Sequence, residues 1–252
     1  MELNQKIDLN ADLGEGFAHD LHILQLVSSV NIACGGHAGD DVTMCETIRL
    51  AMQANVSMGA HPGFEDRERF GRHRLDWTAH QVYESMLKQI QTLYRHAFEA
   101  GGTLKHVKPH GALYHLLLHD EACAQAFVDA IYSIDENLLV FTMPFGSLRA
   151  VAERKGLKVI CEGFADRRYE ADGMLTPRSL GNEAMIHDSL EAEQQVLGFI
   201  KEQMVQTREG QRIVMPVQTI CVHGDGDFAV EQLMRIRALF EREKIQVSAR
   251  FS

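Results

Sequence analysis

The sequence predicts an α/β fold, a TIM-like (β/α) barrel that forms one catalytic domain over residues 1–252. Short, nearly continuous apolar runs, typical of parallel strands covered on both faces, alternate with helical patterns. After nearly every such run comes a polar cluster, as expected where strand ends meet at the mouth of a barrel. A doubly wound open sheet would gather these clusters near one switch point, so we favour the barrel.

The expected strands follow one another along the whole chain. They are Lys6–Leu13, Val30–Cys34, Val56–Ala60, His106–Pro109, Leu138–Met143, Lys158–Phe164, Thr219–Val222 and Gln246–Arg250. Apolar residues at helical spacing predict helices between them. The clearest are Val82–Ala97, ended by Gly101-Gly102; Leu190–Met204, ended by Arg208–Gly210; and Ala229–Phe240, with Asp227 as its N-cap.

Composition excludes several classes of protein. Lys and Arg total 25 against 35 Asp and Glu, and no basic run exceeds a pair, so a nucleic-acid partner is not expected. The N-terminus lacks the order of a signal peptide and no apolar run is long enough to span a membrane, so we expect a cytoplasmic protein. Cys34, Cys161 and Cys221 lie in strand-like runs, which favours buried, reduced thiols.

The first strand carries polar residues on one face only. Asp8, Asn10 and Asp12 alternate with apolar residues 7, 9, 11 and 13, which suit a covering helix layer. A polar interior face is costly unless it binds a metal, a substrate or a basic partner. We therefore favour a polar face that binds such a group over the alternative, a solvated face of an edge strand. Glu15, after Gly14, acts either as a general acid or base or only as a turn cap.

Histidines recur at the ends of the predicted strands. His37 follows Gly35-Gly36, His61 follows the third strand, and His110 and His223 follow later ones. With Asp12 they resemble a carboxylate and imidazole set suited to proton transfer or to a divalent metal held by Asp12, His37 and His61. Both interpretations stay open, because no His-x-His or His-x-x-x-His spacing occurs among the four histidines.

Cationic residues lie beside these histidines. Alternation around Pro109 points Lys108 and His110 to one face, where they hold an anion or polarise a carbonyl group. Arg178 has the chemistry to clamp a carboxylate. In VHGDGD, Asp225 would repel a phosphate unless a cation intervenes. The sequence has no GxxxxGK[ST], GxGxxG or GxSxG motif.

Six ordered motifs identify a family. DLNADLGEG, NIACGGHAGD, GAHPGFEDR, VKPHGALY, FADRRY and VHGDG resemble the LamB/YcsF family, from Ile7 to the C-terminus. The resemblance implies a barrel of the glycoside hydrolase/deacetylase type with seven strands. It also implies ATP-dependent hydrolytic opening of a lactam, 5-oxo-L-proline, to L-glutamate, with ATP as co-substrate and 5-oxoprolinase subunits B and C as partners.

On this basis we assign roles as a hypothesis. Asp12 or Glu15 is the base, and three histidines act as proton donors or ligands: His37, His61 and His110. Lys108 and Arg178 hold a carboxylate or phosphate. The other residues expected to bind substrate or ATP are Asn10, Asp166, Arg167, His223 and Asp225. Two rivals remain: a metal-dependent deacetylase or amidohydrolase that acts alone, and a lactam-binding protein whose chemistry lies in its partners.

Overall fold

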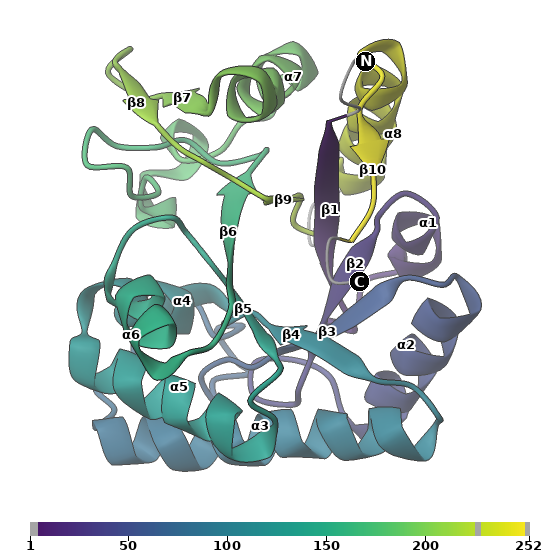
Figure 1. Cartoon of the computed structure of the whole chain (residues 1–252), viewed down its shortest axis with the longest axis vertical. Helices are drawn as coiled ribbons and strands as arrows, with labels where there is room; N and C mark the ends of the chain where they lie inside the picture. Colours follow the sequence, from purple (N-terminus) through teal and green to yellow (C-terminus); the bar gives the residue numbers. More distant parts are fainter. Residues whose placement is uncertain (1–4, 225–227, 250–252) are drawn as a thin grey trace.

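A closed barrel of seven parallel strands forms the centre of the computed structural model, which describes residues 5–224 and 228–249 (Figure 1). The strands are β1 (Lys6–Leu13), β2 (Ser29–Ala33), β3 (Ser57–His61), β4 (Leu104–Val107), β5 (Leu139–Thr142), β6 (Val159–Phe164) and β9 (Thr219–Cys221). Each pairs with the next, and β9 pairs with β1 in the register Asp8–Thr219. This closure confirms the predicted TIM-like barrel.

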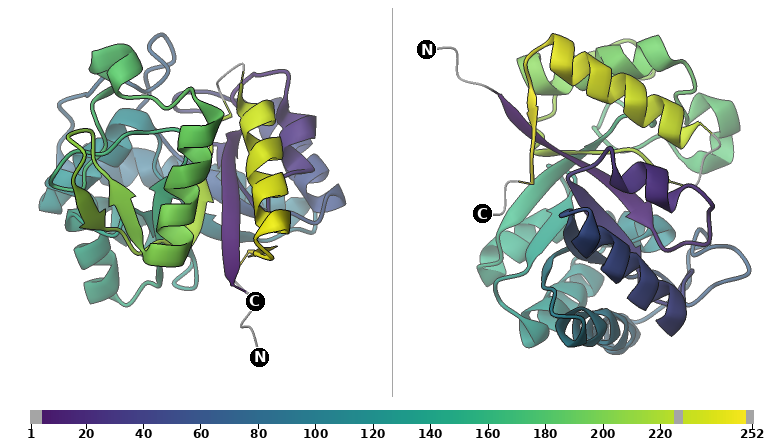
Figure 2. Two further views of the ribbon diagram at one scale, coloured as in Figure 1. Left: turned by 90° about the horizontal axis from the view of Figure 1, so that it is seen from above. Right: turned by 90° about the vertical axis from the view of Figure 1, so that its right-hand side faces the viewer.

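Helices cover the outside of the barrel (Figure 2). They are α1 (Asp20–Leu24), α2 (Asp41–Gln53), α3 (Ala79–Glu99), α4 (Gly111–His119), α5 (Glu121–Ile134), α6 (Ser147–Lys155), α7 (Ser189–Leu197) and α8 (Ala229–Arg242). Asp40 caps α2 by accepting a hydrogen bond from the Thr43 amide. No helix of the described ranges is both long and apolar enough to cross a membrane.

The two faces of β1 separate polar from apolar side chains as the alternation predicted. Asp8, Asn10 and Asp12 are at most 4% exposed and face the barrel interior, where Asn10 donates to Thr219 of the adjacent β9 and to Glu162 of β6. The apolar residues of the strand belong to the main hydrophobic core. Buried polar side chains also occur on β2, β4, β6 and β9.

The connection from β6 to β9 is the longest in the barrel. It contains a 3-10 helix (Arg178–Glu183), α7, a π-helical turn (Gly198–Glu202) and a small hairpin of β7 (Met204–Gln206) and β8 (Arg212–Val214). The predicted helix from Leu190 to Met204 is therefore wrong at its end. Gln203 takes a left-handed conformation that terminates the helix, and Met204 begins a strand.

The remaining predicted elements differ mainly at their ends. The barrel strands after β1 begin or end one or two residues from their predicted bounds. The last strand, β10 (Gln246–Val247), pairs with the start of β1 and is shorter than expected. Asp225, Asp227 and Arg250 lie outside the described residues. All five cysteines are free, and Cys34, Cys161 and Cys221 are buried as predicted.

A candidate active site at the mouth of the barrel

A cavity of about 440 Å³ opens beyond the carboxyl ends of the barrel strands. Its lining includes residues that follow β1, β3, β4, β6 and β9, together with the long β6–β9 connection. The polar members are Asp12, Glu15, His61, Arg72, Arg74, Lys108, His110, Tyr114, His115, His119, Arg167, Thr176, Arg178, Ser179 and His223. This is the position at which a barrel of this kind builds its active site.

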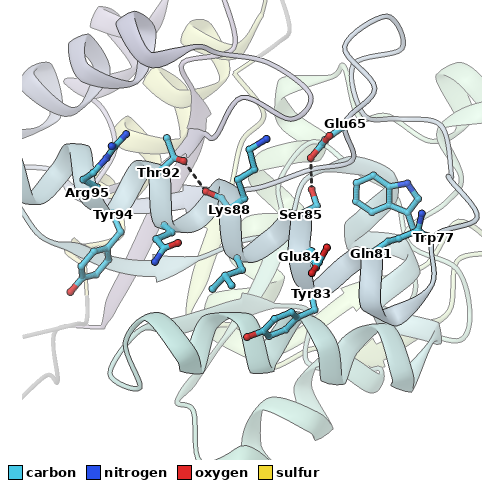
Figure 3. Close-up of a pocket in the computed structure, with 12 residues that line it drawn as sticks. Glu65, Trp77, Gln81, Tyr83, Glu84, Ser85, Lys88, Thr92, Tyr94 and Arg95 are labelled. Carbon is cyan, nitrogen blue, oxygen red and sulfur yellow. Dashed lines mark hydrogen bonds between the residues drawn. The ribbon is translucent and has the colours of Figure 1, made fainter.

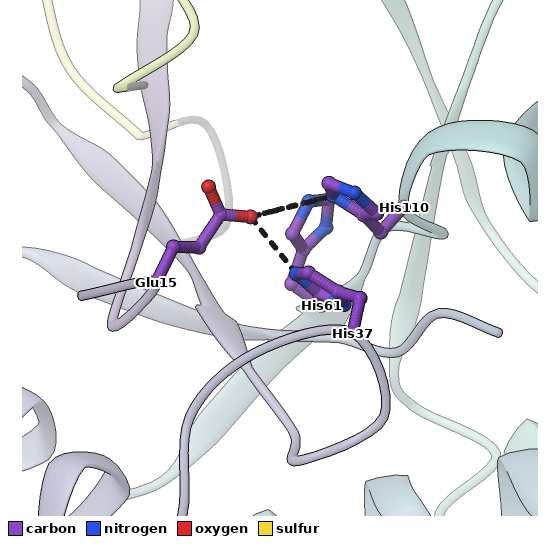
Figure 4. A group of neighbouring side chains, drawn as sticks. All are labelled: Glu15, His37, His61 and His110. Atoms are coloured by element: carbon purple, nitrogen blue, oxygen red, sulfur yellow. Dashed lines mark hydrogen bonds and ion pairs between the residues drawn. The ribbon is translucent and has the colours of Figure 1, made fainter. Parts of the chain in front are cut away.

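Four side chains from consecutive strand ends meet at one side of this cavity (Figure 4). Glu15 follows β1, His37 follows β2, His61 ends β3 and His110 precedes α4. All four are buried, and one donor atom from each lies within 4.8 Å of the others. We call them the His/Glu cluster.

The donor atoms of the His/Glu cluster are close together. Glu15 Oε1 lies 2.9 Å from His37 Nε2, 3.3 Å from His110 Nδ1 and 3.8 Å from His61 Nε2. His61 Nε2 and His110 Nδ1 are 3.0 Å apart. Three imidazoles and a carboxylate at these separations have the composition and spacing to hold a metal ion.

Glycines make room for the imidazole rings. A Cβ on Gly63 would stand 2.7 Å from His37 Nδ1, and one on Gly71 would stand 2.7 Å from His37 Cβ. Gly71 also has a φ of +61°, which a side chain rarely adopts. The His37 and His110 rings stack with centroids 3.6 Å apart. The short glycine-containing turns of the sequence motifs therefore permit this packing.

The charge states in the cluster differ between its members. Burial lowers the pKa of His37 to about 3, and burial also lowers the pKa of His110. For His61, burial opposes protonation, but the neighbouring Asp12 carboxylate raises the pKa above its ordinary value. Burial would likewise disfavour the Glu15 carboxylate, yet its contacts with the imidazoles of His110 and His37 hold its pKa well below its usual range.

Lys108 is the centre of a second buried group inside the barrel. Its Nζ lies 3.0 Å from Asp12 Oδ1, 2.9 Å from Glu162 Oε1 and 3.0 Å from Cys221 Sγ. Burial opposes its charge, but Asp12 and the other neighbours raise its pKa well above the usual value. Asp12 also contacts His61 Nε2 at 3.3 Å and so links the Lys108 group to the His/Glu cluster.

Further polar side chains of the interior hold this group in place. Asn31 donates to Asp12 and to Asn10, both at 2.8 Å, and accepts from His106 Nε2 at 2.7 Å. Tyr114 donates to the second oxygen of Glu162 at 3.2 Å. These bonds satisfy polar atoms that would otherwise be buried without partners.

The cavity wall is rich in cations. Arg72, Arg74, Arg167 and Arg178 line it, and among the described lining residues only Asp12 and Glu15 are acidic. Arg167 donates to the carbonyl groups of Thr176 and Ala184 at 2.7 and 3.3 Å, which fixes its guanidinium group. Burial and then Arg178 lower its pKa to about 10, so it stays charged at neutral pH.

After β6, Asp166 accepts a 2.7 Å hydrogen bond from His223 Nδ1, which follows β9. Burial disfavours the carboxylate, but His223 holds the pKa of Asp166 at about 2. The His223 ring lies nearly parallel to Phe164, with centroids 5.4 Å apart. Asp166 therefore fixes the orientation of His223 and does not itself line the cavity.

The structure brings most of the predicted site residues to one place. Eight of them line the cavity: Asp12, Glu15, His61, Lys108, His110, Arg167, Arg178 and His223. His37 and Asp166 lie behind these side chains, Asn10 lies deeper in the barrel, and Asp225 lies outside the described residues.

Sequence reasoning missed several residues of the same site. They are Asn31, Arg72, Arg74, His106, Tyr114, Glu162 and Phe164. The alternation that singled out Asp8, Asn10 and Asp12 also holds for Ser29 and Asn31 and for His106 and Lys108, so it was an available signal. Arg72 and Arg74 lie well beyond the end of β3, and their place at the cavity depends on the path of the loop before α3.

A second hollow, of about 960 Å³, runs along the outer face of α3 (Figure 3). Its polar side chains bond locally: Ser85 donates to Glu65 at 2.8 Å, and Thr92 donates to the Lys88 carbonyl at 2.8 Å. Neither of the two groups of metal-ligating side chains lies there. The barrel mouth is therefore the candidate active site.

Comparison with known proteins identifies close relatives. Residues 7–251 match the LamB/YcsF family. The chain is 43% identical to a Shouchella clausii protein named as the A subunit of 5-oxoprolinase, over 96% of its own length and 98% of that protein. It is 45% identical to the protein of the same name from Methylococcus capsulatus, over 96% and 95% of the two chains.

Solved structures with the same fold include a relative of this chain. The "Lactam Utilization Protein" of Thermus thermophilus superposes with a TM-score of 0.91 at 36% identity, covering 97% of this chain and 100% of that one. A peptidoglycan N-acetylglucosamine deacetylase shares the fold alone, with a TM-score of 0.50 and 12% identity over 98% and 86% of the chains.

Proposed function

The chain belongs to the LamB/YcsF family, and from this premise we propose that it is the A subunit of a 5-oxoprolinase. In this role it opens the lactam ring of 5-oxo-L-proline to L-glutamate, coupled to ATP hydrolysis, in an assembly with subunits B and C. The names of its relatives and the lactam utilization protein support the assignment. The observation that carries it is the Asp12–Lys108–His61 arrangement at the floor of a cation-lined cavity.

The cavity has the groups that this reaction requires. A lactam is an unactivated amide, so its hydrolysis needs donors that stabilise an oxyanion and a group that delivers protons. Lys108 is a buried cation at the cavity floor and is suited to polarise the lactam oxygen or to stabilise a phosphorylated form of it. The volume, about 440 Å³, exceeds what a five-membered ring needs and leaves space for a transferred phosphoryl group.

The two carboxylates are better suited to orient imidazoles than to act as bases. The pKa values of Asp12 and Glu15 both lie well below their usual range, since charged or donating neighbours stabilise the ionised forms. An efficient base or acid has a pKa near the working pH. We therefore assign the imidazoles of His61 and His110, which line the cavity, either to proton transfer or, with a metal ion between them, to holding that ion.

The arginines provide sites for anionic groups of the substrates. The lactam carries a carboxylate and ATP carries phosphates, and guanidinium groups bind both through paired hydrogen bonds. We assign Arg178 to the substrate carboxylate or a phosphate, with Arg167 and Arg72 beside it. His223, whose Nδ1 is held by Asp166, lines the same cavity beside these arginines.

The decisive experiment measures glutamate and ADP release from 5-oxoproline and ATP. The purified chain is assayed alone and then mixed with subunits B and C. Coupled release of both products only in the mixture is the expected result. Absence of release from the mixture, with all three proteins folded and associated, would contradict the proposal.

The same assay separates the two rival functions. The His/Glu cluster favours a metal-dependent amidohydrolase as the second candidate, and such an enzyme would cleave an amide alone and without ATP. A chain that only binds the lactam would behave differently again. It would bind 5-oxoproline, and Lys108→Met or Asp12→Asn would leave the turnover of the assembly intact.

A further inference from the structure

The hydrogen bonds at the rear of the His/Glu cluster fix which ring nitrogens carry hydrogens. His61 Nδ1 lies 2.8 Å from the Lys108 carbonyl oxygen, and His110 Nε2 lies 2.9 Å from the Phe70 carbonyl oxygen. A carbonyl oxygen only accepts, so both of these nitrogens donate. In neutral rings, His61 Nε2 and His110 Nδ1 are then left without hydrogens and face the centre of the cluster.

These two lone pairs point at each other across 3.0 Å. The Glu15 oxygen, also an acceptor, lies 3.3 Å from His110 Nδ1, and an Asp12 oxygen lies 3.3 Å from His61 Nε2. Several acceptors therefore converge; the one donor available to them is His37 Nε2, 2.9 Å from Glu15 Oε1, and none lies between His61 and His110. Such an arrangement is unfavourable without a cation, which is either one additional proton or a metal ion.

The spacing distinguishes these two cations. A single proton bridges one pair of atoms, and it leaves the other separations of 3.3 and 3.8 Å too long for good hydrogen bonds. Bonds of 2.0–2.1 Å to a tetrahedral ion place neighbouring ligand atoms about 3.4 Å apart. The observed separations of 2.9, 3.0, 3.3 and 3.8 Å lie around that value.

We propose that Glu15, His37, His61 and His110 bind one divalent first-row transition metal ion, with zinc as the best match to three imidazoles and one carboxylate. The backbone carbonyls behind His61 and His110 act as the outer partners that usually orient metal-bound imidazoles. His37 is oriented by its stacking on His110 and by an edge contact with Phe70.

The ion would be accessible from the cavity. Glu15, His61 and His110 line the cavity, whereas His37 lies behind them. This inference does not depend on the lactam activity, because it concerns the chain alone and its own four side chains.

The test is metal content, measured on the full chain purified without a metal-affinity column. Elemental analysis should find about one transition metal ion per chain, and after removal by a chelator, Co²⁺ should restore one equivalent with the intense visible band of a tetrahedral site. Zinc should also raise the thermal midpoint of the metal-free chain, since it binds only the folded state.

Matched variants locate the ion. Glu15→Gln and His37→Asn should lose the bound metal and the Co²⁺ band. His115→Asn, which changes an imidazole of the same cavity outside the cluster, should keep both. Equal metal content and an equal band in all three variants would overturn the proposal, and so would a folded wild-type chain that holds no metal and shows no band. Because no step uses 5-oxoproline or other proteins, neither result tests the oxoprolinase assignment.

Discussion

Two aspartates on the same face of β1 have opposite electrostatic behaviour. Asp8 and Asp12 are both buried in the barrel interior. Burial raises the pKa of Asp8 to about 6, because its partners are only the hydroxyl groups of Ser28, Ser29 and Thr219. Burial acts on Asp12 in the same direction, but His61 and Lys108 hold its pKa well below the usual value.

The difference shows how one strand serves two purposes. Neutral donors stabilise a buried carboxylate less than charged partners do, so Asp8 is held as a structural group near its titration point. Asp12, further along the same face toward the barrel mouth, is an ionised member of the site. The predictions below test whether the identity of the partners, and not the depth of burial, produces this contrast.

The largest effect is expected from Lys108→Met, which removes the cation that distinguishes Asp12 from Asp8. The change leaves Asp12 and Glu162 buried with less compensating charge, so we expect about 3–5 kcal/mol loss of stability. Turnover of the assembled enzyme should be lost as well. Chemical denaturation and the coupled assay measure both quantities.

Lys155→Met is the matched control. Lys155 pairs with Asp129 at 2.6 Å on the surface, and solvent screens such pairs. This variant should unfold almost as the wild type does. A similarly small effect for Lys108→Met would show that the buried lysine does not compensate Asp12.

Asp12→Asn should reduce turnover about 10²- to 10⁴-fold, because His61 loses the carboxylate that favours its protonated form. The coupled release of glutamate and ADP by the assembled enzyme measures the loss. Asp8→Asn, at the other end of the same face, should retain turnover. Equal losses in the two variants would mean that the contrast between the aspartates has no catalytic meaning.

The titration of Asp8 should appear in the stability of the chain. Its pKa is about 6 in the folded state and 3.8 as the ordinary value, so the folded state binds the proton more tightly. Well below pH 3 Asp8 is protonated in both states. As the pH rises from about 3 to about 7, through the unfolded and then the folded pKa, its contribution to the free energy of unfolding should fall by about 3 kcal/mol in total.

Asp8→Asn provides the reference, because it cannot titrate at this position. The difference in free energy of unfolding between the wild type and this variant should decrease between pH 4 and pH 6 and be constant above pH 7. Denaturation curves at several pH values measure it. A difference that stays level across this range would show that Asp8 ionises normally.

The smallest effect is expected for Arg178→Gln at the cavity wall. Loss of one guanidinium contact to an anionic ligand should raise KM about tenfold and leave kcat nearly unchanged. Arg154→Gln, which alters an exposed pair with Glu121, should change neither constant. A fall in kcat without a change in KM would assign Arg178 to the chemical step instead of to binding.

The sequence predicted the fold well because its main signals are local. Alternation in β1 and apolar runs in the other strands identify buried parallel strands, and apolar residues at helical spacing identify α3 and α8. The error near Met204 has a local cause too. The apolar spacing of α7 continues into the π-helical turn, and only the left-handed Gln203 shows where the chain turns into β7.

The sequence by itself also determined which strand ends bear the polar side chains of the candidate site: Asp12, Glu15, His61, Lys108 and His110 come from the quoted motifs and all line the cavity. The tertiary structure decided how they pair. Closure of the barrel places Glu162 of β6 against Lys108 of the β4 end, and Glu15 beside three histidines from other strands. Charge states and a metal-compatible spacing depend on distances of about 3 to 4 Å between residues far apart in sequence. No local pattern encodes these distances, because they arise only when the seven strands close.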